Sequence, residues 1–227
     1  MISRLPRWTW TGFFLLAVNA GIVNVVALLC FSHSATTHVT GLFSQLSIHL
    51  HHHDYYSVRG IALIIGAFFL GAFLSGFIIR DEHFQIGRRY GYALAAESAL
   101  LYLSAYNLIH HQFLGAVFAS VAAGLQNAMV TNFSGTIVRT THMTGIVTDL
   151  GMYLGRFAAG NKLDTRKIGL FLLIIAGFTG GGFAASVFYG IFQERVMLIA
   201  AVLTTALTAG YEYFRRLPAG NTDQKTQ

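Results

Sequence analysis

The chain has 227 residues, of which 54% are hydrophobic and only 11% are charged, and its formal net charge is +6. Its mean hydropathy of +0.56 is outside the range of a soluble domain, which excludes nucleic-acid binding as the natural explanation of the positive charge. The single cysteine, Cys30, excludes an intramolecular disulfide. The composition predicts a polytopic membrane protein whose basic residues report its topology.

Long uncharged apolar runs recur along the chain, and each is long enough to cross hydrocarbon as a helix. We therefore predict an all-α transmembrane bundle of about six helices. The polar tail at 217–227 is predicted to be disordered. The expected helices are 12–31, 60–79, 90–109, 112–131, 168–192 and 196–214.

A hexapeptide occurs twice with one conservative change: Thr-Thr-His-Val-Thr-Gly at 36–41 and Thr-Thr-His-Met-Thr-Gly at 140–145. An apolar stretch that ends in Asn24 precedes the first copy, and one that ends in Asn127 precedes the second. Two matched motifs in matched order predict an internal duplication. The two repeats are expected at 1–111 and 112–216.

Lysine and arginine are distributed very unevenly over the expected loops. With six crossings, only Arg59 and Arg195 lie on the side opposite to the N-terminus. The positive-inside rule then places both termini in the cytoplasm of a bacterial inner membrane. The expected cytoplasmic side, which holds both termini, carries Arg4, Arg7, Arg80, Arg88, Arg89, Arg139, Arg156, Lys162, Arg166, Lys167, Arg215, Arg216 and Lys225.

Each repeat has three crossings, so the second repeat has to enter the membrane from the opposite face. The two halves are therefore expected to be inverted copies. Each motif is followed by a stretch too short or too polar to span, at 41–50 and at 145–158. We expect both stretches to be re-entrant or interfacial half-helices, with Thr40 and Thr144 as their N-terminal caps.

Two helix starts that converge near the midplane would present free N–H groups and positive dipole ends to one small volume. The alternative is that the small and polar residues of the motif only hold helices together. For Gly151–Gly155 and Gly177–Gly181, which have GxxxG spacing, we expect such packing. The expected pathway residues are Asn24, Thr40, Gly41, Gln126, Asn127, Arg139, Thr144 and Gly145.

Glu97 and Asp149 are the acids expected within membrane depth, where a carboxylate is a functional candidate by default. Either residue is a candidate for coupling to protons, and Glu97 has the alternative of a simple hydrogen-bonded carboxyl. Arg139 is expected to pair with Asp149 or to face an anionic solute.

Histidines gather in the segment after the first motif. His49 and His53 are four residues apart and would share a helix face, with Asp54 as an added oxygen ligand. No known ligand spacing accompanies them, so a solvated loop is the favoured interpretation and a metal site the weaker one. No cofactor is expected. No catalytic motif stands out either, so we expect a protein that is not an enzyme.

The two motif regions resemble the YoaK family of small bacterial membrane proteins. The resemblance rests on 21–24 with Thr40-Gly41, and on 124–127 with 139–145. It implies an inner-membrane protein that moves small metabolites. We therefore expect a transporter or exporter of a small polar or anionic solute, with the bilayer as partner, no nucleic acid, and a homodimer as a plausible assembly. The alternative is a sensor or assembly subunit whose outer histidines read pH or metal.

Overall fold

The computed structural model describes residues 8–30, 38–80, 87–134 and 139–216. These residues form eight α-helices and one short 3₁₀ helix. An all-helical fold is confirmed for this part of the chain. The predicted disordered tail and the first two threonines of the first motif lie outside the described residues. The helices are α1 (Trp8–Cys30), α2 (Val39–His51), α3 (Tyr55–Ile79), α4 (Arg88–Ile109), α5 (Leu114–Phe133), α6 (Met143–Ala158), α7 (Thr165–Phe192), η2 (Gln193–Val196) and α8 (Met197–Arg216).

The six helices expected from the apolar runs are all present, and each differs from its expected bounds by a few residues. The two stretches expected to be half-helices are α2 and α6, complete short helices that each bury a single residue, Leu42 and Ile146. From α1 to α4 and again from α5 to α8, the chain runs long, short, long, long. In each half, the described chain therefore has one short helix in addition to the three long helices expected from the sequence.

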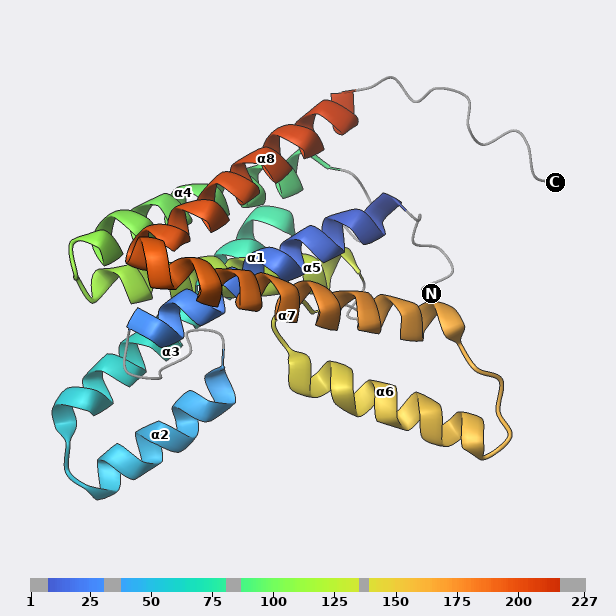
Figure 1. The fold of residues 1–227 in the computed structure, drawn as a ribbon, viewed down its shortest axis with the longest axis horizontal. Coiled ribbons are helices and arrows are strands. Elements are labelled where there is room, and N and C mark those ends of the chain that lie inside the picture. Colours follow the sequence, from blue (N-terminus) through green and yellow to red (C-terminus); the bar gives the residue numbers. More distant parts are fainter. Residues whose placement is uncertain (1–7, 31–37, 81–86, 135–138, 217–227) are drawn as a thin grey trace.

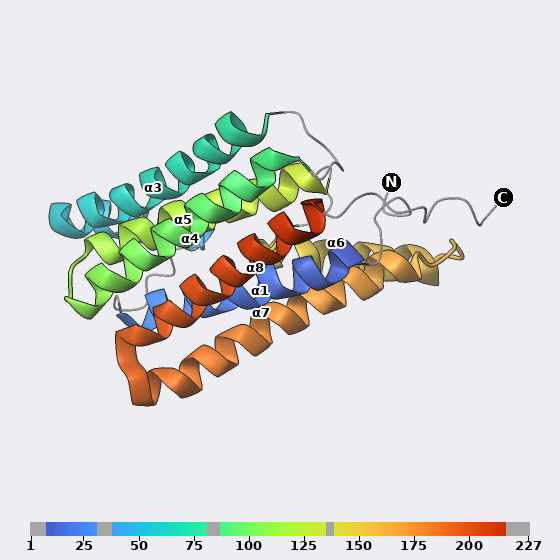
Figure 2. The same cartoon turned by 90° about the horizontal axis from the view of Figure 1, so that it is seen from above.

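Each long helix at the start of one half packs along the third helix of the other half: α1 lies along α7, and α5 lies along α3. Helix α4 contacts both α5 and α8. Figure 2 shows the resulting two groups, α3 and α5 with α4, and α1 and α7 with α8. Each half therefore packs a long helix against the other half, and separating the halves would expose the α1–α7 and α3–α5 contacts.

Glycines permit these two crossings. A methyl group on Gly21 would collide with the carbonyl oxygen of Phe178, and one on Gly124 would collide with that of Phe68. Gly181 on α7 faces the backbone of α1 in the same way, and Gly71 on α3 faces the backbone of α5. Small residues let helix backbones approach closely. The expected packing role of Gly177–Gly181 is confirmed. A methyl group on Gly151 or Gly155 would meet no atom within 4 Å beyond the backbone of its own helix in the described structure, so that expectation was wrong for them.

Four segments of the described chain are long and apolar enough to cross a membrane: Thr9–Cys30, Tyr55–Ile79, Leu114–Phe133 and Thr165–Arg216. Large apolar side chains on α3 and α7 face outward, with Phe77 70% and Phe183 72% exposed. Outward apolar side chains on long helices suit a lipid environment. Both features support a membrane protein. Helix α4 is not among the four segments, and it buries Glu97, Ser98, Ser104 and Asn107.

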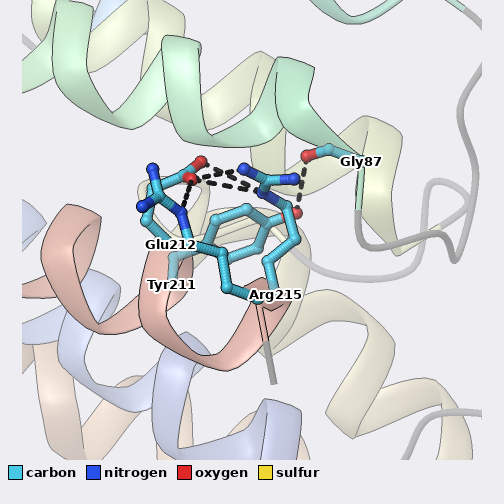
Figure 3. A network of polar contacts seen from close by, with 5 residues as sticks. Gly87, Tyr211, Glu212 and Arg215 are labelled. Atoms are coloured by element: carbon cyan, nitrogen blue, oxygen red, sulfur yellow. Dashed lines mark hydrogen bonds and ion pairs between the residues drawn. The ribbon is translucent and has the colours of Figure 1, made fainter. Parts of the chain in front are cut away.

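The end of α8 is fastened to the start of α4 (Figure 3). The hydroxyl of Tyr211 donates to the carbonyl oxygen of Gly87 at 3.0 Å. Arg215 Nη2 donates to Glu212 Oε2 at 2.6 Å, and Arg216 Nε lies 3.7 Å from the same oxygen. In Figure 1, α1 begins and α8 ends at the same end of the bundle.

Helices α3 and α7 begin with the same cap. The carboxylate of Asp54 accepts a hydrogen bond from Ser57 N at 3.2 Å, and that of Asp164 accepts one from Lys167 N at 3.1 Å. Aspartate is a favoured N-cap because it satisfies one of the free N–H groups of the first turn.

We expect Asp164→Ala to lower the free energy of unfolding by about 1 kcal/mol, since alanine cannot accept that bond. Asp164→Asn is the matched control, because asparagine keeps the acceptor and should retain most of the stability. Thermal unfolding of the purified protein in detergent measures both variants. Equal losses in the two variants would show that the charge of Asp164, and not its capping bond, is what matters.

Candidate functional site

The duplicated motif forms the start of α2 and of α6 with nearly identical backbone geometry. His38 has φ −93° and ψ 62°, and His142 has φ −94° and ψ 63°. These histidines are the N-caps, and neither makes a side-chain capping hydrogen bond. The prediction that Thr40 and Thr144 are the caps was wrong, because each helix starts two residues earlier than expected.

The glycine of each motif gives room to the histidine of the same motif. A Cβ atom on Gly41 would overlap the imidazole of His38, and one on Gly145 would overlap the imidazole of His142. Each ring therefore folds back over the first turn of its own helix. This contact explains why a glycine stands three residues after the histidine in both copies.

A cavity of about 580 Å³ lies where the two motif copies meet. In Figure 1 the N-terminal ends of α2 and α6 point toward each other, and the two helices diverge from there along one face of the bundle. Helices α1, α3, α5 and α7 supply the remaining wall. The described lining residues are Asn24, Leu28, His38, Val39, Thr40, Gly41, Leu42, Gln45, Phe68, Asn127, Thr141, His142, Met143, Thr144 and Phe178.

Five of the eight residues expected to form a pathway line this cavity: Asn24, Thr40, Gly41, Asn127 and Thr144. Corresponding residues of the two halves thus face one space, although they are far apart in the sequence. Phe68 and Phe178, whose carbonyl oxygens lie at the glycine crossings, line it as well.

Gln126, Arg139 and Gly145 are not among the lining residues. Gln126 is buried at 2% exposure one position away from Asn127, so it points to another side of α5. Arg139 is exposed, and its Nη1 lies 3.3 Å from His142 Nδ1. Within the described residues Arg139 forms no ion pair with Asp149, which lies on α6, a helix that packs along α7.

The described lining also contains four polar residues that were not predicted from the sequence: His38, Gln45, Thr141 and His142. The signal for the two histidines was present, since they occupy the same position of the duplicated motif. Gln45 could not have been found in this way, because it reaches the cavity from one turn further along α2.

A buried polar network lies beside the cavity. Asn19 Nδ2 donates to Glu97 Oε1 at 3.1 Å and to Gln126 Oε1 at 3.2 Å. Gln126 Nε2 donates to the carbonyl oxygen of Leu16 at 2.8 Å and to Thr140 Oγ1 at 2.9 Å. Asn19 and Thr140 are fully buried and Glu97 is 1% exposed. The network connects the carboxyl of Glu97 on α4 to Thr140, which lies next to the cavity. Its central member, Asn19, was not predicted, because Asn19 is not part of the duplicated motif.

The histidine-rich segment is the end of α2 and the turn into α3. His49 Nδ1 lies 3.0 Å from Asp54 Oδ2, while His53 Nδ1 faces the hydroxyl of Tyr55 at 3.4 Å. Hydrogen bonds from Ser57 lower the pKa of Asp54, whose carboxylate serves as the cap of α3. No group of three or more His, Cys, Asp or Glu residues within the described chain could hold a metal ion.

The fold and the cavity define a class: a helical membrane protein with matched polar residues around a cavity of about 580 Å³ between its halves. The family model described as "Protein of unknown function (DUF1275)" matches residues 12–210, and the chain belongs to that family. No curated protein and no solved structure matches the chain.

Proposed function

We propose that the protein is a transporter or exporter of a small polar or anionic solute, and that the solute passes through the cavity between α2 and α6. The observation that carries this proposal is that both copies of the motif line one space of about 580 Å³. Duplicated halves with short helices that meet near the middle are typical of secondary transporters. Within its family of unknown function we place the chain in the YoaK group.

The chemistry of the lining supports an uncharged polar or anionic solute. The described lining contains two histidines and several amides and hydroxyls but no carboxylate. The first residues of α2 and α6 both belong to it, and helix N-termini present N–H groups without partners in the helix. These donors bind oxygen atoms of a solute better than they bind a cation.

Inverted repeats in a bacterial inner membrane, with both termini in the cytoplasm, complete the proposal. The divergence of α2 and α6 in opposite directions supports inversion (Figure 1). The uneven distribution of lysine and arginine supports the cytoplasmic termini. In this arrangement the two motif copies approach the cavity from opposite faces of the membrane.

The first test is access of water to the motif. Single cysteines at Thr40→Cys and Thr144→Cys, in a Cys30→Ala background, are treated with a membrane-impermeant maleimide on each face of oriented vesicles. We expect both cysteines to react, because Thr40 and Thr144 are exposed and line the cavity. Thr204→Cys is the control and should not react, since Thr204 on α8 is fully buried.

Protection of positions 40 and 144 from both faces would show that the motifs are sealed packing elements and would end the transporter proposal. A sensor that reads metal makes a different prediction: isothermal titration with Zn²⁺ would show binding that is lost when His49 and His53 are replaced by alanine. Maleimide access that survives those replacements favours transport.

A further inference from the structure

A second, narrower space lies next to the large cavity, between α1, α4 and α5, and it has no room for a water molecule. Glu97 and Gln126 line it, together with Ala20 and Ala123, which occupy corresponding positions of α1 and α5. Thr141 lines this space and the large cavity as well. Thr141 is therefore the residue that the described linings of the two spaces share.

Two oxygens of the buried network have no hydrogen-bond partner within the described structure. They are Glu97 Oε2 and Asn19 Oδ1. A buried acceptor without a donor costs about 1–3 kcal/mol, and more if it is charged. A proton added to the carboxylate of Glu97 would supply the missing donor between these two oxygens. A carboxylic acid carries such an O–H group, whereas a carboxylate only accepts.

The surroundings of Glu97 offer no positive charge. The groups that face it are the amide of Asn19 from α1 and the amide of Gln126 from α5, and α8 packs beside it through the hydroxyl of Thr205, which bonds to Ser98. No ion pair in the described part of the chain includes Glu97. An isolated carboxylate inside a membrane protein is costly unless it binds a cation. The space is too narrow for a hydrated ion, so a proton is the cation that fits.

We propose that Glu97 is a proton-binding site that is loaded from the large cavity past Thr141, and that its proton controls the motif at the start of α6. A hydronium ion of cavity water loses its proton and becomes water, and the proton reaches a carboxylate oxygen of Glu97 past Thr141, which yields the neutral acid. The acid then donates toward Asn19, whose amide turns to accept. When the amide turns, Gln126 loses the hydrogen bond that Asn19 donates to it. Gln126 is the residue that donates a hydrogen bond to Thr140. The coupling to transport rests on the proposed function, whereas the proton site does not.

The network occurs once and is not repeated, although its members come from both halves of the chain. The positions of Asn19 and Gln126 correspond to Ala122 and Val23 in the other half, and neither side chain can hydrogen-bond. Both of these apolar residues line the same narrow space. The structure therefore assigns one proton to each chain.

Infrared difference spectroscopy between acidic and alkaline pH tests the site on the full chain in lipid nanodiscs. We expect a carboxylic C=O band that is lost in Glu97→Gln and retained in Asp149→Asn. Glutamine keeps the acceptor for Asn19 and so preserves the fold; if it does not fold, Glu97→Asp should shift the band instead of removing it. A band that is absent, or unchanged in every Glu97 variant, overturns the proposal.

The coupling is tested by the rate at which Thr144→Cys reacts with the maleimide as the pH is changed. The thiol itself reacts faster at higher pH, so the ratio to the same cysteine in a Glu97→Gln background is the relevant quantity. We expect this ratio to change several-fold across the transition of the carboxyl band, and a constant ratio would overturn the control of the motif by Glu97. A cavity closed to maleimide with the band intact would remove the transporter proposal and leave the proton site.

Discussion

Gly181→Ala is expected to destabilise the protein strongly, while Gly180→Ala, one residue away on the same helix, is not. A methyl group on Gly181 would enter the space of the carbonyl oxygen of Val18 on α1. A methyl group on Gly180 would have no neighbour within 4 Å in the described structure. Overpacking typically costs about 1–3 kcal/mol, and the upper part of that range applies because the obstacle is backbone, which cannot rotate away.

The pair Gly181→Ala and Gly180→Ala isolates the crossing, because both substitutions raise helix propensity by up to about 1 kcal/mol. The measurement is the melting temperature of each variant in detergent. Gly71→Ala should behave like Gly181→Ala, since its methyl group would meet the carbonyl oxygen of Val121 at the equivalent crossing of α3 and α5. A melting temperature of Gly181→Ala equal to that of Gly180→Ala would contradict the close approach of α1 and α7.

Gln126→Leu is the second substitution expected to have a large effect. Leucine has a similar size but leaves Leu16 O, Thr140 Oγ1 and Asn19 Nδ2 each without the bond that Gln126 makes. Each abandoned buried group costs about 1–3 kcal/mol, although Asn19 keeps its bond to Glu97. We expect a loss of several kcal/mol in the free energy of unfolding, together with faster maleimide labelling of Thr144→Cys as the motif loosens.

Thr140→Ala removes only the hydrogen bond between Gln126 and Thr140, and it serves as the control. Its loss should be smaller, and in the double variant with Gln126→Leu it should add little, because the shared bond is already gone. Additive losses would mean that Gln126 and Thr140 are not coupled, which would sever the link between Glu97 and the cavity.

The sequence by itself determined the helical membrane class and most of the helices. Apolar runs such as 60–79 contain enough information to predict a helix, because every backbone polar group in hydrocarbon has to be satisfied within the segment. It also predicted that the residues around Asn24 and Asn127 contribute to one site, since the duplicated motif is visible in the sequence alone. Five residues selected in this way line the cavity.

Helix starts were less well predicted. Helices α2 and α6 begin at Val39 and Met143, which are not typical residues of a helix start. The threonines that follow are typical N-caps, so the caps were predicted there. The histidine at each cap makes no side-chain capping bond and is fixed by packing on a glycine, which is a contact between side chain and backbone rather than a local propensity.

Only the tertiary structure decided which faces of the helices meet. Gln126 and Asn127 are neighbours in the sequence, yet one points into the buried network and the other into the cavity, because adjacent residues of a helix point about 100° apart. Asn19 became part of the network because the packed bundle brings α1 next to Glu97 of α4 and Gln126 of α5, and no local pattern records those contacts. Composition and repetition fix what a chain contains, whereas the pairing of distant helix faces depends on contacts that form only when the whole bundle packs.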